Sequence, residues 1–217
     1  MKVKICGITS EGDALAAVEL GATHIGFVFH EASPRCVTIA IAAQISQRLP
    51  KGITKVGVFV NQRVDVVQST MRAAGLDVAQ LHGDETPEVC RASAQRFWKA
   101  LRANPGCDRD AMLADAVTFT GCECVLVDAK ADLRLGGTGQ LSDWQLATAL
   151  GTKVNVVLAG GLNASNVADA IKAVRPWGVD VSSGVEARPG IKDKDKMAAL
   201  FAAIQRVDKP HIAAERT

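Results

Sequence analysis

The sequence predicts an α/β protein, a (βα)8 TIM barrel that forms a single compact domain. Eight short apolar runs alternate with amphipathic helical segments, and the turns between them are short and marked by Gly or Asp. Eight βα units are the number that closes a barrel. The 217 residues leave roughly 27 per unit, which is near the minimum for such a unit. We therefore expect residues 1–207 to form the barrel and residues 208–217 to form a C-terminal tail.

The predicted strands are runs of three to six mostly apolar residues, rich in β-branched side chains, as buried parallel strands require. In chain order they are Val3–Cys6, His24–Phe29, Lys55–Val60, Val78–Leu81, Phe97–Leu101, Cys124–Val127, Val154–Leu158 and Val179–Val181.

Helical segments are predicted between the strands. The first has an apolar face formed by Leu15, Val18 and Leu20, and it ends at Gly21, a residue suited to a left-handed C-cap. Two further apolar stripes define helices before Gly75 and near the end of the chain: Val66, Val67, Met71 and Ala74, and then Met197, Leu200, Phe201 and Ile204.

An open doubly wound sheet is the competing architecture. Its first strand would be followed by a glycine-rich dinucleotide-binding loop, but Cys6 is followed only by a single Gly7. The glycine-rich turns come after the seventh and eighth strands instead, where barrels bind phosphate. This placement favours the barrel.

The composition excludes several other classes of protein. The net charge is +2 and no basic tract is present, so we expect no nucleic-acid partner. No charged-then-apolar leader and no apolar run of membrane-spanning length occurs, which predicts a cytoplasmic protein with no membrane partner. The six cysteines are scattered, and the only close pair, Cys122 and Cys124, is too close for a zinc knuckle. We expect neither a metal site nor a disulfide framework.

Two glycine-containing turns predict a phosphate site. The seventh strand ends at Gly160 and Gly161, and the eighth ends at Ser183 and Gly184. Glycine allows several backbone N–H groups to approach a phosphate, and a short helix after Gly184 would add the positive end of its dipole. Either turn alone could be an ordinary glycine turn, but a barrel places these two loops side by side.

Candidate acid–base groups lie at the ends of two strands. Cys6 ends the first strand and is followed by Gly7, and Asp128 follows the sixth strand. Functional side chains of barrels occupy such positions. From position alone, Cys6 could equally be a small buried hydrophobe and Asp128 a helix or loop cap.

Four more residues are candidates for contact with a substrate or with the thiol. Arg35, in the loop after strand two, could hold a carboxylate, or it could be a solvated surface residue. His82 ends strand four and could bind substrate or be structural. Asp180, in strand eight, would face the barrel mouth or pair there with a cation. Lys4 would share the inward face of strand one with Cys6 and could supply positive charge.

A set of ordered motifs resembles the phosphoribosylanthranilate isomerase family of tryptophan biosynthesis. The motifs run from residue 2 to about residue 196 in the order of the family. They are Lys4–Thr9, Ser33–Arg35, Val56–Asn61, Gln80–Gly83, Gly136–Gly139, Leu158–Leu162, Asp180–Glu186, Pro189–Gly190 and Lys192–Asp193.

The resemblance implies an Amadori rearrangement of N-(5-phosphoribosyl)anthranilate, without a cofactor, because the imine of the substrate serves as the electron sink. It implies that Asp128 is the general acid and Cys6 the general base. Arg35 would hold the anthranilate carboxylate, and Asp180 would assist near the sugar hydroxyls. The phosphate would be bound by Gly160, Gly161, Ser183 and Gly184.

The chain departs from the family pattern at Ser142, where the family usually has Phe; we expect this Ser to be a helix N-cap.

The nearest rival is the related isomerase of histidine biosynthesis, whose base is an aspartate on strand one and whose first half-barrel has a second phosphate site. Here strand one carries Cys6, and the first half of the chain has no comparable glycine pair at a strand end. The same two features disfavour a bifunctional enzyme. A non-catalytic phosphosugar-binding barrel is the rival from another class. We expect a small phosphorylated substrate and a monomer or homodimer.

Overall fold

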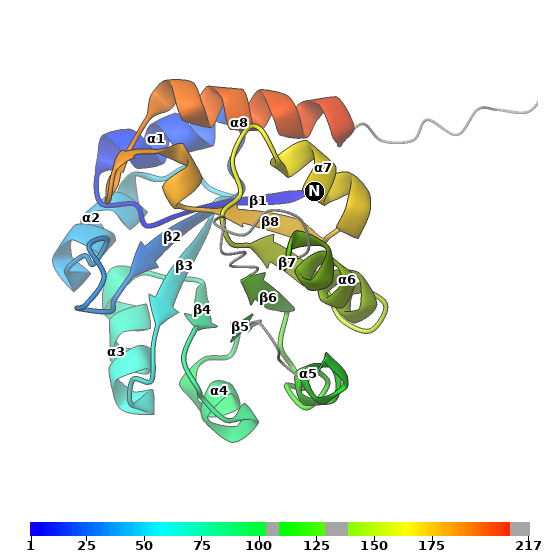
Figure 1. The fold of residues 1–217 in the computed structure, drawn as a ribbon. Coiled ribbons are helices and arrows are strands. Elements are labelled where there is room, and N and C mark those ends of the chain that lie inside the picture. Colours follow the sequence, from blue (N-terminus) through cyan, green and yellow to red (C-terminus); the bar gives the residue numbers. More distant parts are fainter. Residues whose placement is uncertain (103–108, 129–138, 209–217) are drawn as a thin grey trace, which may run out of the picture.

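The computed structural model describes residues 1–102, 109–128 and 139–208, and its central feature is a closed barrel of eight parallel strands (Figure 1). Each strand pairs with the next along the chain, and β1 also pairs with β8, which closes the sheet. The strands are β1 (Lys2–Cys6), β2 (His24–Val28), β3 (Thr54–Phe59), β4 (Val78–Leu81), β5 (Phe97–Arg102), β6 (Cys124–Asp128), β7 (Val156–Ala159) and β8 (Gly178–Val181). The predicted fold is confirmed, and every predicted strand end falls within two residues of the observed one.

Helices surround the barrel on the outside (Figure 1). They are α1 (Glu11–Leu20), α2 (Ile39–Arg48), α3 (Val64–Ala74), α4 (Pro87–Ser93), α5 (Arg109–Ala116), α6 (Gly139–Gly151), α7 (Val167–Val174) and α8 (Lys194–Val207). A single 3-10 turn, η1 (Ser183–Val185), and a hairpin of β9 (Glu186–Arg188) and β10 (Ile191–Lys192) separate β8 from α8. Within the described ranges, no helix is long and apolar enough to cross a membrane. Of the predicted tail, residues 209–217 lie outside the described residues.

The first helix shows how local chemistry sets the boundaries. The Ser10 hydroxyl caps its start by accepting from the Asp13 N–H, and Gly21 ends it at φ 115°. Its predicted apolar face was only partly right. The helix buries Ala14 and Ala17, while Val18 and Leu20 are half-buried at the margin. Small side chains let this helix approach the barrel more closely than a leucine face would.

The other predicted stripes lie largely as expected. Val67 and Ala74 of α3 are buried, but Val66 is 40% exposed. All four predicted residues of α8 are buried: Met197, Leu200, Phe201 and Ile204. The prediction for Ser142 was wrong, because α6 begins at Gly139 and Ser142 is therefore its fourth residue and not its N-cap.

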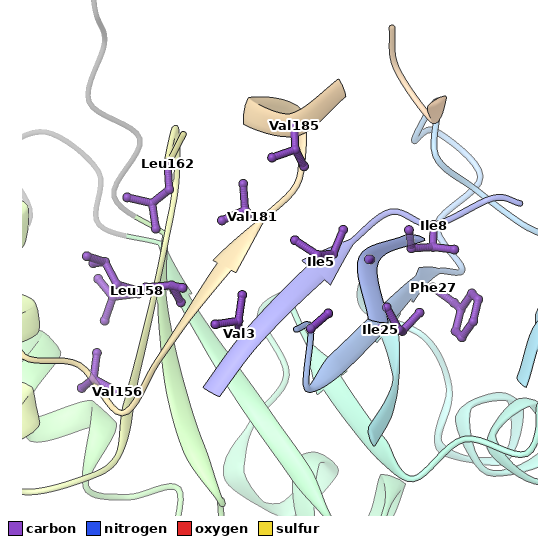
Figure 2. Close-up of a cluster of buried hydrophobic side chains, with 14 of the residues drawn as sticks. Val3, Ile5, Ile8, Ile25, Phe27, Val156, Leu158, Leu162, Val181 and Val185 are labelled. Atoms are coloured by element: carbon purple, nitrogen blue, oxygen red, sulfur yellow. The ribbon is translucent and has the colours of Figure 1, made fainter. Parts of the chain in front are cut away.

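The two-residue period of the strands divides the core into two parts. Side chains such as Ile5, Ile25 and Leu158 point outward and pack under the helices (Figure 2). A second cluster, which includes Trp98 and Leu126, fills the inside of the barrel. A third set lies above it, nearest the carboxyl ends of the strands, and consists of Cys6, Val28 and Val58. The inward face of β1 therefore brings Cys6 to the open end of the barrel.

Candidate active site

A pocket of about 430 Å³ opens at the carboxyl ends of the strands. It brings together residues from seven of the eight strands or the loops that follow them. Those with polar side chains or backbone available to a ligand are Cys6, His30, Ser33, Arg35, Gln80, His82, Asp128, Gly160, Gly161, Asp180, Ser182 and Ser183. All the candidate residues from the sequence except Gly184 and Lys4 line this one pocket.

Cys6 reaches the pocket because its neighbour on β2 is a glycine. Cys6 pairs with Gly26 in the sheet, and a Cβ on Gly26 would lie 3.0 Å from the Cys6 sulfur and 2.9 Å from Cε of Lys4. The missing side chain therefore makes the space in which the thiol and the Lys4 arm lie next to each other. Burial raises the pKa of the Cys6 thiol, although the positive charges of Lys4 and Lys192 oppose the rise.

Lys4 and Asp180 form a buried ion pair inside the barrel, with Nζ 2.9 Å from Oδ2. Burial lowers the pKa of Lys4, but the charges of Asp180 and Cys6 outweigh it and the pKa is raised overall, so the ammonium stays charged. The second oxygen of Asp180, Oδ1, is buried and has no hydrogen-bond partner among the described residues. Asp180 is therefore both a salt-bridge partner and a source of one free acceptor at the pocket.

Asp128 is the last residue of β6 and faces His82 across the pocket, with Oδ2 3.7 Å from Nε2 of the imidazole. Gln80 Nε2 lies 2.9 Å from His82 Nδ1. If the amide donates this bond, the imidazole proton is on Nε2 and points toward Asp128. Oδ1 of Asp128 is buried and unpaired in the part of the chain that the structure describes. One carboxylate oxygen is thus available to a bound molecule.

The two predicted phosphate loops are in direct contact. A Cβ on Gly184 would overlap the carbonyl oxygen of Leu162, so only glycine allows the loop after β8 to lie against the loop after β7. Gly160 and Gly161 both have positive φ, 86° and 66°. The predicted short helix is a single 3-10 turn at Ser183–Val185, so the loops offer backbone N–H groups and little helix dipole. Gly184 lies behind the pocket wall and does not line it.

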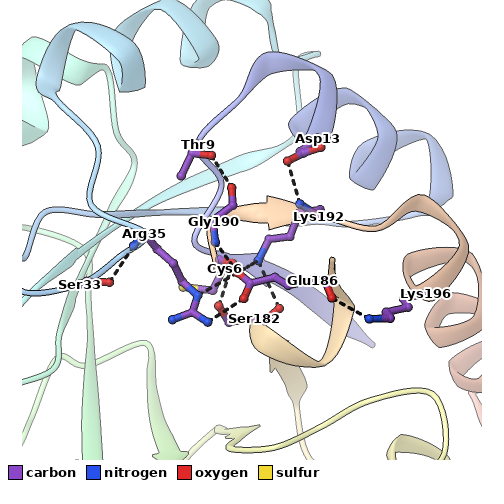
Figure 3. A network of polar contacts seen from close by, with 10 residues as sticks. All are labelled: Cys6, Thr9, Asp13, Ser33, Arg35, Ser182, Glu186, Gly190, Lys192 and Lys196. Carbon is purple, nitrogen blue, oxygen red and sulfur yellow. Dashed lines mark hydrogen bonds and ion pairs between the residues drawn. The ribbon is translucent and has the colours of Figure 1, made fainter. Parts of the chain in front are cut away.

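Sequence reasoning assigned no role to Glu186, which lies against Arg35 in the structure (Figure 3). Arg35 donates from Nε to Oε1 at 2.8 Å and from Nη2 to Oε2 at 2.6 Å. Lys192 donates to the same Oε1 from its own buried Nζ at 2.9 Å. Arg35 is therefore not a freely solvated surface residue. Only the family motif pointed to Glu186, because the two partners are 151 positions apart in the chain.

Acid should remove the contribution that ionised Glu186 makes to the stability of the fold. Burial opposes ionisation of this carboxyl, but hydrogen bonds from Arg35 and Lys192 outweigh it and lower its pKa from 4.5 to about 2. A depressed folded-state pKa contributes stability that is complete above the unfolded value and is lost as the pH falls through the folded value. The advantage of the wild type over Glu186→Gln in free energy of unfolding should therefore shrink between about pH 4.5 and pH 2. Urea unfolding of both proteins across this range measures it; a constant difference would contradict the assignment.

In the described part of the chain, no group of three or more His, Cys, Asp or Glu residues is placed to hold a metal ion. The chemistry that the pocket offers consists of a thiol, carboxylates, an imidazole and cations. This set suits proton transfer on an anionic molecule.

Sequence comparisons with known proteins all identify the same family. Residues 3–203 match the model of a family described as N-(5'phosphoribosyl)anthranilate (PRA) isomerase. The N-(5'-phosphoribosyl)anthranilate isomerase of Pelobacter propionicus is 48% identical over 197 residues, which cover 91% of this chain and 92% of that protein. The protein of the same name from Nitrosospira multiformis is 44% identical over 204 residues, covering 94% and 96%.

Solved structures agree in fold. Phosphoribosyl anthranilate isomerase from Thermotoga maritima has a TM-score of 0.83 and 39% identity, covering 95% of this chain and 99% of that chain. A phosphoribosyl anthranilate isomerase in complex with reduced 1-(o-carboxyphenylamino)-1-deoxyribulose 5-phosphate has a TM-score of 0.82, 37% identity and the same coverage. A third similar structure, with the same coverage, 37% identity and a TM-score of 0.82, is of monomers generated from the dimeric Thermotoga maritima enzyme.

Proposed function

The chain belongs to the N-(5'-phosphoribosyl)anthranilate isomerase family and is an isomerase of tryptophan biosynthesis, and from this premise we propose how its pocket performs the reaction. The single observation that supports the proposal most is that Cys6, Asp128 and the two phosphate loops share one pocket. The thiol and the carboxylate come from strands on different sides of the barrel. They can therefore act on different atoms of one bound molecule.

The bound molecule of a related crystal structure defines the groups that this pocket must recognise. Reduced 1-(o-carboxyphenylamino)-1-deoxyribulose 5-phosphate carries a phosphate, sugar hydroxyls and an aromatic carboxylate. We assign the phosphate to the N–H groups around Gly160, Gly161 and Ser183, with Gly184 keeping the two loops in contact. We assign the carboxylate to Arg35, and one sugar hydroxyl to Oδ1 of Asp180.

Asp128 acts first in this proposal, as the general acid. It donates a proton to the furanose ring oxygen, the bond from that oxygen to C1 breaks, and the nitrogen lone pair forms the C1=N bond of a protonated Schiff base. The neighbouring His82 would direct Nε2–H toward the carboxylate that remains, which stabilises its negative charge. Ring opening therefore needs no group outside the pocket.

Cys6 acts second, as the general base. Its thiolate removes the proton on C2, the electron pair of that bond forms C1=C2, and the positively charged nitrogen becomes neutral. The resulting enolamine tautomerises to the ketone as C1 gains a proton and the C2 hydroxyl loses one. Although burial raises the pKa of the free thiol, the protonated Schiff base adds a positive charge to those of Lys4 and Lys192 and favours the thiolate when it is needed.

The rivals lack support in the pocket. The histidine-pathway isomerase would need an aspartate where β1 has Cys6, and a bifunctional enzyme meets the same objection. A non-catalytic binding barrel would leave unexplained why a thiol and a carboxylate share a pocket with two phosphate loops. We further propose that the enzyme works in the cytoplasm, because a catalytic thiol must stay reduced, and that it is a monomer or a homodimer.

Arg35→Ala tests the carboxylate assignment. Loss of a charge-assisted hydrogen bond should raise KM by roughly 10- to 100-fold and leave kcat within a few-fold of the wild type. Arg48→Ala is the matched control, because Arg48 lies on α2, is 67% exposed and is remote from the pocket lining. Steady-state kinetics measure both parameters. An unchanged KM for Arg35→Ala would show that another group holds the carboxylate.

The reaction itself is tested by following the fluorescence of phosphoribosylanthranilate with the purified protein. We expect a catalysed loss of signal and identification of 1-(2-carboxyphenylamino)-1-deoxyribulose 5-phosphate by mass spectrometry. A rate no greater than the uncatalysed one would refute the proposal, provided that the circular dichroism spectrum shows a folded barrel.

A further inference from the structure

Glu186 does not line the pocket, yet it holds one of the residues that do. Its carboxylate meets Arg35 from the side, through Nε and Nη2 (Figure 3). A guanidinium has five N–H donors in a rigid plane, and this contact uses two of them. The outer edge, formed by Nη1 and the second proton of Nη2, keeps the parallel pair of donors that a second carboxylate needs for a bidentate contact.

Glu186 is itself held on several sides and cannot easily follow Arg35 if that residue moves. Nζ of Lys192 lies 2.9 Å from Oε1, and the Gly190 N–H donates to the same oxygen at 3.3 Å. Nζ of Lys196 donates to the Glu186 backbone carbonyl at 2.8 Å. The side chain is 4% exposed, and its lowered pKa of about 2 keeps it charged at neutral pH. The β9–β10 hairpin thus presents a fixed carboxylate.

The arm of Arg35 packs against the backbone of Gly7, the residue next to the proposed base. A Cβ on Gly7 would lie 2.6 Å from Cδ of Arg35, so the arm crosses Gly7 closely. The guanidinium end is 22% exposed and lines the pocket. The three charges of Arg35, Lys192 and Glu186 leave one net positive charge at this place, which suits a single anionic group on the substrate.

We propose that Glu186 is a positioning residue for the reaction: it fixes the guanidinium of Arg35 so that the edge formed by Nη1 and Nη2 faces the substrate carboxylate. The inference rests on the carboxylate-binding role proposed for Arg35. Without Glu186, the long side chain of Arg35 would populate several rotamers, and each substrate that binds would have to order this side chain again. Orientation by Glu186 therefore supports recognition of the carboxylate and not of the rest of the substrate.

The test compares the binding of two ligands. One is reduced 1-(o-carboxyphenylamino)-1-deoxyribulose 5-phosphate, and the other is the same molecule without the aromatic carboxylate. The Kd of the carboxylate-free ligand divided by the Kd of the complete ligand, both measured by titration calorimetry, isolates the carboxylate contact. In Glu186→Gln we expect this ratio to fall roughly 10-fold, while the affinity for the carboxylate-free ligand stays within about twofold of the wild type.

Glu123→Gln is the matched control. Arg96 donates from Nε and from Nη2 to the two carboxylate oxygens of Glu123, so this variant breaks the same kind of pair, but neither residue lines the pocket. Its ratio should stay within about twofold of the wild type. In an Arg35→Ala background, Glu186→Gln should not change the ratio further. If Glu186→Gln acted through a general structural effect, it would still change the ratio in that background.

The outcomes separate the two claims. A wild type that binds both ligands equally would overturn the role of Arg35, and with it this inference. A wild type that discriminates, with Glu186→Gln discriminating as well or better, would overturn the inference alone. If Glu186→Gln does not fold, Glu186→Asp replaces it: the charge toward Lys192 remains, but the side chain is one methylene shorter and cannot keep both bonds to Arg35. The same fall in the ratio is expected.

Discussion

Cys6→Ser should reduce kcat by about 10²- to 10⁴-fold while leaving substrate binding and the fold largely unchanged. A hydroxyl is a far weaker acid than a thiol, so the serine variant supplies almost no anionic base. Serine is also slightly smaller than cysteine, and the space beside Gly26 accepts it without a clash. Single-turnover kinetics, together with the Kd of the reduced product analogue, separate the chemical step from binding.

Cys122→Ser is the control for this variant. Cys122 is half-buried just before β6 and outside the pocket lining, and its sulfur donates to a backbone carbonyl, a bond that a hydroxyl can make. We expect wild-type turnover from it. Wild-type turnover from Cys6→Ser would remove Cys6 from the mechanism.

Asp128→Asn should reduce kcat by a similar factor, about 10²- to 10⁴-fold, because an amide cannot donate a proton to the ring oxygen as a carboxylic acid does. The amide has nearly the same shape, so the contacts with His82 and the strand should change little. The loss should appear in kcat much more than in the Kd of the reduced product analogue, which is already ring-opened.

Asp169→Asn is the matched control for charge, since Asp169 is 72% exposed on α7 and outside the pocket lining. It should keep full activity. If Asp128→Asn also kept full activity, ring opening would need another acid, and His82 would be the next residue to change.

The barrel could be predicted from the sequence because its determinants are local. A two-residue period and β-branched side chains specify each strand, and Gly21 and Gly75 end their helices at positive φ. The shared pocket of Cys6 and Asp128 followed from one rule, that parallel strands of a barrel bring their carboxyl ends to one face. This rule holds however far apart Cys6 and Asp128 are in the sequence.

The polar pairings could not be predicted in the same way, because they join residues far apart in the chain. Lys4 and Asp180 are 176 positions apart, and their pairing depends on the register between β1 and β8. Glu186 begins the β9–β10 hairpin and meets Arg35 of the loop after β2 across 151 positions of the chain. The close contact of Gly184 with Leu162 likewise depends on the tertiary structure. Sequence motifs included these residues but did not predict which residues they contact.

The order of the two steps is tested most directly by kcat with a substrate that carries deuterium at C2. If Cys6 removes this proton, the residual reaction of Cys6→Ser is limited by that step and should show a large primary isotope effect. If Asp128 opens the ring, Asp128→Asn is limited by an earlier step, and its kcat should not respond to the deuterium. An isotope effect in Asp128→Asn but not in Cys6→Ser would contradict the assignment of acid and base.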